Sequence, residues 1–398
     1  PLRLVGSEMC IRDRTSFRQA KFATSISFFI NGLGNGTFVS RIPDLKHQLE
    51  ISNSKLGLAL FFGSVGVLSS LQLAGKFCAK FGSGPTTKTL NFLLALAPPL
   101  VGLKIGFIWL CFALLIQGFF AAGQDVAMNA HGSTIELKSQ KRIMSGLHAL
   151  WSLGAFSGGA LGGLATQLKI TPFKNFCFTA SIVLIISIIF RNKFLGAEVD
   201  QHDLEVRVKS KRPKIFLVLG LLGLCGAIGE GAASDWGGVL IRDTFHATGF
   251  LVALPYVLFC TTMVLGRFSG DFLAHKFGTK NLIIVCGFLA GGGLSIGLIL
   301  GGYFGVLLAW FLLGIGLSVV IPMMFSAAGT IADKEYKAII SNGEAIAIVS
   351  GVTYFGFMVG PPMMGSIGDA IGLRWAMFIP AGLAIFLALG ARKILTSS

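Results

Sequence analysis

The chain has 398 residues, of which 53% are apolar and only 13% are Asp, Glu, Lys or Arg. A soluble domain usually carries about a quarter charged residues, and a soluble globule of this size needs a polar exterior. The mean hydropathy of +0.76, with many Phe, Leu and Ile residues, equally excludes a disordered chain. The composition therefore indicates a protein that crosses a membrane several times.

Uncharged stretches predict an all-α integral membrane protein with twelve transmembrane helices, because a helical span needs about 20 mostly apolar residues. Gly301 and Gly302 divide the longest uncharged stretch into two spans. The expected helices cover residues 20–41, 54–77, 86–105, 107–136, 142–168, 171–190, 215–240, 248–275, 280–301, 304–332, 337–366 and 372–392.

A polar segment at residues 191–214 divides the predicted helices into two sets of six. We therefore expect an N-terminal six-helix bundle at 20–190, a linker at 191–214 and a C-terminal six-helix bundle at 215–395. A tail at residues 1–19 precedes the first bundle. Its residues 1–14 resemble a read-through peptide from sequencing adapters more than native protein, so we assign them no function.

The net charge of +15 is concentrated in one set of loops. An even number of spans places both termini on the same side of the membrane, together with the 191–214 linker. Most of the 33 Lys and Arg residues fall on that side, which the positive-inside rule assigns to the cytoplasm. Membrane topology thus explains the basic charge, and we expect no nucleic-acid partner.

The sequence offers no complete motif for catalysis, metal binding or ATP use. The seven Cys residues are scattered and form no CxxC, which argues against a disulfide framework or a zinc site. There is no GxxxxGK[ST] phosphate loop, no HExxH, and no G-x-S-x-G with a supporting triad. We therefore expect no enzymatic activity, no cofactor and no metal.

An internal repeat relates the two halves at an offset of 196 residues. Lys80-Phe81-Gly82 then falls on Lys276-Phe277-Gly278, each just after the second helix of its half. With one residue of adjustment, Gly34-Asn35-Gly36 meets Gly229-Glu230-Gly231. Two six-helix repeats are typical of transporters whose halves rock about a central site.

Several motifs resemble those of the major facilitator superfamily, over residues 20–395. Gly75-Lys76-Phe77-Cys78-Ala79-Lys80-Phe81-Gly82 is similar to the family's G-x-x-x-D-R-x-G loop, with Ala79 in place of the acid. Gln117-Gly118-Phe119-Phe120-Ala121 is similar to its Q-G-x-G-A segment. The runs 125–129, 143–152 and 229–236 resemble the YbjJ-like branch of bacterial inner-membrane proteins, relatives of fucose permease. The resemblance implies a transporter of the bacterial cytoplasmic membrane.

Asp125 and Asn129 are the leading candidates for solute and proton binding. They lie four residues apart near the middle of the predicted fourth span and so share one helix face. An ionisable group inside a span costs at least about 2.5 kcal/mol on insertion scales and is a functional candidate by default. In fucose permease-like proteins an acid and an Asn at this spacing take part in sugar and proton handling, which the resemblance implies for this pair. A structural hydrogen bond between helices is the alternative for Asp125.

Glu230 lies near mid-depth of the predicted seventh span, at the position that the repeat pairs with Asn35. Its flanking glycines allow close helix approach or local unwinding. We expect Asn35 and Glu230 to line the central site with Asp125 and Asn129, and Asp125 or Glu230 to carry the proton. Trp151 is a candidate for stacking on a sugar ring, and helix packing is its alternative role.

Further polar residues are candidates for the cavity mouth, an inner gate and proton transfer. Asp235 and Trp236 are expected at the mouth of the cavity, with an interfacial anchor as the alternative for Trp236. His148 and Glu344 are related by the 196-residue offset. Both are expected about two turns inside their helices, where they form an inner gate or a proton relay. Hydrogen bonding within each half is the alternative.

The loops after the second and eighth spans predict a latch between the halves. Arg267 and Asp271 are four residues apart and can pair along one helix. The resemblance implies that such charges hold one conformation of the transport cycle together with four loop residues, namely Lys80, Gly82, Lys276 and Gly278.

The sequence thus predicts a secondary active transporter, acting as a monomer in the lipid bilayer. Its partners are a small polar organic solute, of sugar-like chemistry, and protons that drive alternating access. Proton-driven efflux of amphipathic compounds is one alternative, permitted by the 35 Phe residues. A membrane sensor that transports nothing is the other, permitted by Ala79 and His275 in the loop motifs.

Overall fold

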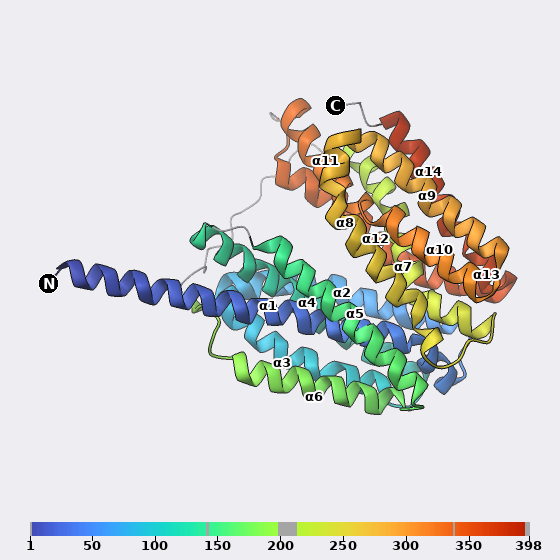
Figure 1. Cartoon of the computed structure of the whole chain (residues 1–398), viewed down its shortest axis with the longest axis horizontal. Coiled ribbons are helices and arrows are strands. Elements are labelled where there is room, and N and C mark those ends of the chain that lie inside the picture. The colour runs from blue at the N-terminus through green and yellow to red at the C-terminus, as the bar shows by residue number, and fades with distance from the viewer. Residues whose placement is uncertain (1, 141–142, 198–212, 337–338, 395–398) are drawn as a thin grey trace. The chain divides into compact units, whose positions relative to one another are not determined.

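The computed structural model describes residues 2–140, 143–197, 213–336 and 339–394, without the side chains of residues 2–16, 271, 342 and 343. Every regular element in these ranges is a helix (Figure 1). Eight helical stretches of this part are long and apolar enough to cross a membrane. The all-α prediction is therefore confirmed.

The first half of the chain forms six helices at the predicted places. They are α1 (Leu2–Leu49), α2 (Asn53–Phe81), α3 (Ser83–Gly102), α4 (Phe107–Ser139), α5 (Met144–Gln167) and α6 (Pro172–Phe190). The helix α1 is longer than expected at both ends, and it continues through Pro43.

The second half forms six further helices, two of which are interrupted. They are α7 (Lys214–Asp243), α8 (Leu254–Phe277) with the short 3-10 helix η2 (Gly249–Val252) before it, α9 (Thr279–Leu300), the pair α10 (Gly302–Leu317) and α11 (Val320–Glu335), α12 (Asn342–Ile371), and the pair α13 (Leu373–Ala376) and α14 (Phe378–Ile394). With each pair counted as one broken helix, the described part contains the predicted twelve.

The break between α10 and α11 was not predicted, and Pro322 helps to explain it. Proline has no backbone N–H, so it cannot donate to the carbonyl four residues earlier, which belongs to Ser318. The backbone N–H of Ser318 bonds to the carbonyls of both Gly314 and Ile315. This bifurcated bond tightens the last turn of α10, and it leaves the Ser318 carbonyl available to a side chain.

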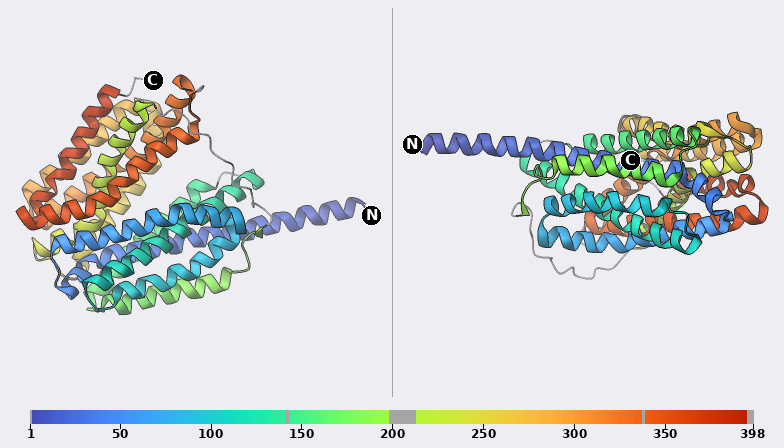
Figure 2. Two further views of the ribbon diagram at one scale, coloured as in Figure 1. Left: turned by 180° about the vertical axis from the view of Figure 1, so that it is seen from behind. Right: turned by 90° about the horizontal axis from the view of Figure 1, so that it is seen from below.

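Contacts divide the chain into two compact units. The first contains residues 1–38, 62–165 and 170–206, and the second contains residues 39–61, 166–169 and 207–398. In the first unit α3 packs on α4 and α6, and these helices run side by side in both views (Figures 1 and 2). In the second unit α7 packs on α12, and α9 packs on α10 and α14. The predicted bundle boundaries at residues 190 and 215 stay predictions.

Glycines bring α1 and α5 into close contact within the first unit. A Cβ at Gly154 would collide with the carbonyl of Phe29, and one at Gly158 would collide with the carbonyl of Leu33. Small residues that let helix backbones approach are typical of membrane helices. This crossing fixes the position of Trp151, which lies one turn before Gly154 on α5.

Candidate functional site

A cavity of about 280 Å³ lies inside the first unit and contains three of the predicted substrate-binding residues, Asn35, Asp125 and Trp151. Five helices contribute to its wall. The lining residues are Asn31, Gly34, Asn35, Val67, Leu94, Pro98, Gln117, Ala121, Ala122, Asp125 and Trp151. The wall thus combines an apolar face with a small set of polar groups, as is usual for small-molecule sites.

Asp125 and Asn129 are in contact on α4, as their spacing predicts. The Nδ2 group of Asn129 donates to the Asp125 carboxylate at 3.2 Å and to the Asp125 backbone carbonyl at 2.8 Å. Asp125 lines the cavity, and Asn129 is one helical turn further on, outside its wall. Asn129 therefore positions the Asp125 carboxylate in this structure. A direct role for Asn129 in substrate binding stays a prediction.

A network of neutral side chains joins α1, α3 and α4 beside the cavity. The Nε2 group of Gln124 donates to Asn91 Oδ1 at 2.9 Å and to the backbone carbonyl of Ser27 at 3.1 Å. Asn31 Nδ2 donates to the side-chain carbonyl of Gln124, and Asn91 Nδ2 donates to Ser27 Oγ at 2.9 Å. All four side chains are buried. The sequence signal for this network is the presence of uncharged amides inside apolar spans. Ionisable residues alone do not indicate it.

Trp151 is held in the cavity wall by this network. Its indole Nε1–H donates to Asn31 Oδ1 at 2.8 Å, and Asn31 also donates to the backbone carbonyl of Ala121 at 3.1 Å. The single donor of the indole is therefore satisfied within the protein. The indole can offer a solute its ring rather than its N–H group, which agrees with the predicted stacking role.

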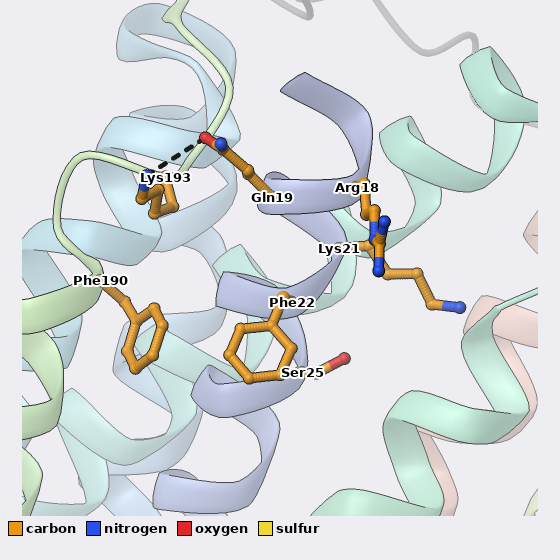
Figure 3. A pocket seen from close by; sticks show the side chains of 7 residues that line it. All are labelled: Arg18, Gln19, Lys21, Phe22, Ser25, Phe190 and Lys193. Carbon is orange, nitrogen blue, oxygen red and sulfur yellow. Dashed lines mark hydrogen bonds between the residues drawn. The ribbon is translucent and has the colours of Figure 1, made fainter. Parts of the chain in front are cut away.

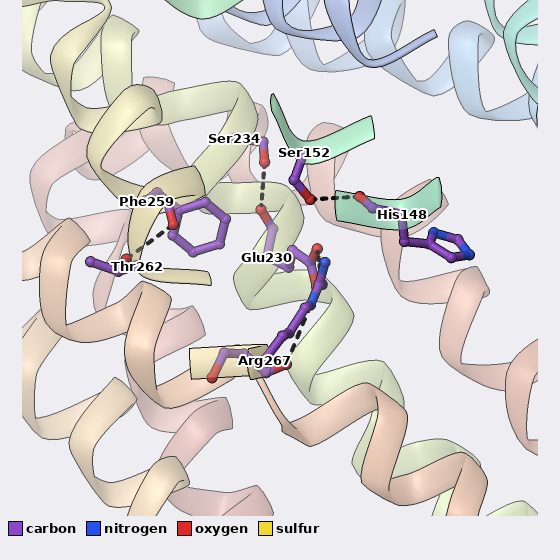
Figure 4. Close-up of polar contacts among 8 residues, drawn as sticks. His148, Ser152, Glu230, Ser234, Phe259, Thr262 and Arg267 are labelled. Carbon is purple, nitrogen blue, oxygen red and sulfur yellow. Dashed lines mark hydrogen bonds and ion pairs between the residues drawn. The ribbon is translucent and has the colours of Figure 1, made fainter. Parts of the chain in front are cut away.

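Glu230 lies in the second unit, where it pairs with Arg267 (Figure 4). Arg267 Nη2 is 3.4 Å from Glu230 Oε1, and Arg267 Nε donates to the Ser318 carbonyl at the α10–α11 break at 3.4 Å. The expected partner of Arg267 was Asp271, whose side chain lies outside the described residues. The predicted pair of Arg267 and Asp271 therefore stays a prediction, while the break between α10 and α11 offers Arg267 an acceptor that the sequence pattern did not predict.

Two other predicted residues have unexpected places in the helices. Trp236 is fully buried, so its side chain packs inside the second unit rather than being exposed as an interfacial anchor, and its place at the cavity mouth stays a prediction. Glu344 was expected two turns inside its helix, but α12 begins only at Asn342. Glu344 accepts hydrogen bonds from the backbone N–H and the hydroxyl of Ser341, and Ser341 Oγ accepts from the Glu344 N–H. This arrangement is a capping box, which accounts for the early position of Glu344.

His148 is exposed on α5, one turn after that helix begins. Its ring makes an edge-to-face contact with Phe28 at 5.2 Å between centroids. Its backbone carbonyl accepts a hydrogen bond from Ser152 Oγ at 3.0 Å (Figure 4). The predicted gate or relay between His148 and Glu344 would join residues of different units and stays a prediction.

The two Lys-Phe-Gly loops have matching local geometry, as the repeat predicts. Lys80 Nζ lies 5.2 Å from the Phe81 ring centroid, and Lys276 Nζ lies 5.3 Å from that of Phe277. The glycine that follows each phenylalanine has a positive φ, 82° at Gly82 and 79° at Gly278. Because L-residues rarely adopt this conformation, the glycines are needed to turn the chain between helices. Their role in gating stays a prediction.

A cluster of charges at helix ends in the second unit was missed by the sequence analysis. Asp44 forms ion pairs with Arg41, whose Nε atom lies 2.9 Å away, and with Arg242, and it accepts a hydrogen bond from Thr166 Oγ1 at 2.7 Å. Lys46 pairs with Asp243. The available signal was the presence of opposite charges near the ends of the first and seventh predicted helices. These charges were treated as ordinary loop residues because the chain turns close by.

Two backbone caps lie at other helix ends of the second unit. The carboxylate of Asp369, at the end of α12, accepts from the backbone N–H groups of Asn53 and Ser54, at 3.0 and 2.8 Å. The side chain of Gln167, at the end of α5, accepts from the Phe250 N–H at 3.1 Å. Each acceptor satisfies donors that the start of a helix leaves unpaired, and together they hold the starts of α2 and η2.

A second cavity, of about 620 Å³, lies between residues 18–25 of α1 and the end of α6 (Figure 3). Its lining contains Arg18, Lys21 and Lys193 and no acid, and Lys193 Nζ donates to Gln19 Oε1 at 3.4 Å. This larger cavity shares no residue with the one around Asp125. Its basic groups match the cytoplasmic side of the predicted topology. The cavity contains none of the predicted substrate-binding residues.

Comparison with known families decides the class of this protein. The sequence profile of the Major Facilitator Superfamily matches residues 24–342 and 239–396. The chain belongs to this superfamily. It is therefore a multi-pass membrane protein with the major facilitator fold, as the motifs in α2 and α4 predict.

Individual relatives agree with this assignment. A protein of Sinorhizobium fredii named as an uncharacterized transporter is 29% identical over 356 residues, which are 88% of this chain and 92% of the relative. Two solved structures share the fold. A mutant of the nucleoside transporter NupG has a TM-score of 0.77 at 12% identity, covering 96% of this chain and 100% of its own. The superfamily transporter FucP in its outward conformation has a TM-score of 0.60 at 18% identity, covering 96% and 100%.

Proposed function

We propose that this protein is a secondary active transporter that moves a small polar organic solute, of sugar-like chemistry, by proton-coupled alternating access. The observation that carries the proposal is the cavity of the first unit, which places Asn35, Asp125 and Trp151 around one space. A carboxylate and amides can hydrogen-bond hydroxyl groups, and an aromatic ring can cover the apolar face of a sugar. The superfamily assignment supports transport as the activity.

Asp125 is the better candidate for the proton carrier. Within the described part of the chain, its carboxylate contacts the Asn129 amide and no basic side chain. An unpaired carboxylate inside a span is costly as an anion, so protonation and deprotonation of Asp125 can be linked to solute binding. Glu230 has the guanidinium of Arg267 as its partner, and this pair keeps its charge balanced without a proton.

The proposal includes the direction, the membrane and the assembly state. The solute is taken up together with protons across the bacterial cytoplasmic membrane, with both termini and the 191–214 linker in the cytoplasm. The distribution of the basic residues supports this orientation. The transporter works as a monomer, because each chain supplies both six-helix repeats.

Uptake into liposomes tests the proposal. The purified protein would be reconstituted and offered labelled glucose, galactose, fucose, sorbitol and uridine, with and without an imposed pH gradient. We expect at least one probe to accumulate only when the outside is more acidic. Accumulation of that probe irrespective of the pH gradient would refute proton coupling, and transport of none of them, with export of a cationic dye instead, would favour efflux.

Substitution of the two acids then identifies the proton carrier. We expect Asp125→Asn to abolish gradient-driven accumulation, because an amide cannot gain and lose a proton in the cycle. Exchange of labelled for unlabelled solute needs no net proton movement and should persist. The matched control is Glu230→Gln with Arg267→Gln, which removes a pair of opposite charges together and should leave the pH dependence intact. Full accumulation by Asp125→Asn would exclude Asp125 as the carrier.

A further inference from the structure

Gln117 is a buried side chain of the cavity wall whose carbonyl oxygen has no donor among the described residues. It is about nine-tenths buried, with an exposed fraction of 9%, and its Oε1 atom makes no hydrogen bond. Buried amides are normally satisfied, so each exception needs an explanation. Gln124, two turns along the same helix, shows the ordinary case, because its amide bonds to α1 and α3.

We infer that the Gln117 amide is a specificity-determining contact for the transported solute, and that the cavity selects neutral, hydroxyl-bearing rings and rejects anions. This inference rests on the proposed function and assigns a substrate class to the same site. Gln117 had been noted only as part of a superfamily motif, without a role in binding.

The positions along α4 bring Gln117 and Asp125 to one side of the cavity. They are eight residues apart, which is about 12 Å along a helix axis, and Ala121 lies midway between them on the same face. The small side chain of Ala121 leaves the space between the two polar groups open. A solute seated over Ala121 can therefore reach the Gln117 amide at one end and the Asp125 carboxylate at the other.

The charge of the lining determines the class of solute. Asp125 is the single ionisable group among the residues that line this cavity, which include no Lys, Arg or His. A carboxylate or phosphate on the solute would meet a negative charge and no cation, which raises the free energy of its binding. The Gln117 carbonyl and the Asp125 carboxylate both accept hydrogen bonds, so they suit hydroxyl donors.

The backbone of α3 adds another acceptor to the same wall. Pro98 has no N–H and cannot donate to the carbonyl of Leu94, and both residues line the cavity. The Trp151 ring offers the cavity an apolar surface, because its N–H is bonded to Asn31. A cavity of about 280 Å³ is just below the range of about 300 to 1,000 Å³ typical of ligand pockets. The size thus favours a solute with a single ring.

Direct binding to the purified protein tests the inference independently of transport. The probes are sets of sugars that share one ring and differ in a single charged substituent, such as glucose, glucosamine and glucuronate, and the corresponding galactose set. Binding would be measured by calorimetry in detergent. We expect a neutral hexose to bind at least about tenfold more tightly than its uronate, which corresponds to about 1.4 kcal/mol. Equal or tighter binding of the uronate would overturn the inference.

Three variants separate a substrate contact from a structural role. Gln117→Leu should weaken hexose binding about tenfold and leave the melting temperature unchanged, because the carbonyl oxygen that it removes has no partner in the protein. Ala121→Leu should weaken binding by filling the space between the polar groups. Leu137→Ala, on an exposed part of the same helix, is the control and should change neither. Hexose affinity unaltered in Gln117→Leu would overturn the inference.

The outcomes for the inference and for the proposed function are distinct. Tight hexose binding that depends on Gln117, without any uptake into liposomes, would uphold the inference and refute transport. Proton-driven uptake of a hexose with the same affinity in Gln117→Leu would uphold transport and refute the inference. Loss of binding in Gln117→Leu together with a lowered melting temperature would mean that Gln117 acts structurally, and would also refute it.

Discussion

In the first unit a network of neutral side chains joins three helices, whereas in the second unit pairs of opposite charges join helices. Gln124 joins α1, α3 and α4 through hydrogen bonds to Asn31, Asn91 and Ser27. In the second unit Glu230 pairs with Arg267 between α7 and α8. The repeat pairs Glu230 with Asn35, so related positions carry an acid in one half and an amide in the other.

This difference suggests a division of labour between the repeats. A neutral network fixes helices without adding charge, so Asp125 is left as the one ionisable group of its cavity. A paired carboxylate is less free to exchange protons, because its anionic form is stabilised by the guanidinium. The first unit is thus suited to recognise a solute and bind a proton. The second is suited to hold its helices together by charge.

The largest effect on stability is expected from Gln124→Ala. The substitution removes the bonds of Gln124 to Asn31, Asn91 and the Ser27 carbonyl, and it leaves an N–H of Asn31 and the side-chain carbonyl of Asn91 without these partners, in a site where Gln124 is fully buried. Each unsatisfied buried group costs about 1–3 kcal/mol. We expect a loss of about 4 kcal/mol in the free energy of unfolding, measured by titration with SDS from mild detergent.

Gln117→Ala is the matched control for Gln124→Ala, since both glutamines are buried on α4. The Oε1 atom of Gln117 has no partner to lose, so this variant should lose much less stability than the Gln124 variant. Equal losses would mean that the network around Gln124 contributes little beyond the packing of its side chain.

Asp44→Ala is expected to have the next largest effect, and it tests the charged region. It removes the carboxylate that Arg41 and Arg242 share, next to the almost completely buried Arg41 guanidinium. Removing one partner of a buried pair costs about 3–5 kcal/mol. We expect a loss of about 3 kcal/mol in the free energy of unfolding. This value is at the low end of that range, because Arg242 is partly exposed and its contribution is screened.

Salt separates this effect from that of the amides. The loss caused by Asp44→Ala should shrink as the salt concentration rises, because ions screen the exposed part of the cluster. The loss caused by Gln124→Ala should not change with salt. The same salt response in both variants would contradict the distinction between neutral and charged regions.

The sequence predicts the helices well because long apolar stretches constrain them directly. Asp125 and Asn129 could also be predicted as a pair, since their contact lies within one helix and follows from their spacing. Contacts between helices were harder to predict. Gln124, Asn31 and Asn91 are far apart in sequence, and nothing in their spacing indicates that they meet.

Local breaks in helices account for the other differences. Pro322 ends the regular pattern near Ser318, and the free carbonyl there takes a hydrogen bond from Arg267. Helical spacing alone predicts a pair of Arg267 and Asp271 and gives no sign of this acceptor. Likewise, a capping box at Ser341 and Glu344 fixes the start of α12, whereas an apolar pattern locates a helix end only to within a few residues.

A smaller effect is expected from Arg267→Gln, which leaves Glu230 without its ionic partner. Arg267 is 41% exposed and Glu230 is 22% exposed in their side chains, so the loss should be about 2 kcal/mol, below the range for fully buried pairs. Adding Glu230→Gln should restore part of this stability, because no unpaired charge then remains. The free energies of the single and double variants would be measured in one cycle. A double variant less stable than Arg267→Gln would show that Glu230 is stabilised by something other than this pair.

The smallest effect is expected at Glu344, where the two accounts of the residue give opposite results for a conservative change. If Glu344 acts as a helix cap, Glu344→Gln should keep the capping box, because the glutamine carbonyl can still accept from the Ser341 N–H. Glu344→Ala should then lower the free energy of unfolding by about 1 kcal/mol.

A proton carrier would behave differently, because a glutamine cannot be protonated in its place, and gradient-driven uptake would be lost in Glu344→Gln without loss of stability. We expect uptake by Glu344→Gln to equal that of the wild type, measured beside Asp125→Asn in the same liposomes. That result would confine proton binding to the first unit, while loss of uptake would extend it to the start of α12 and remove the contrast between the two regions.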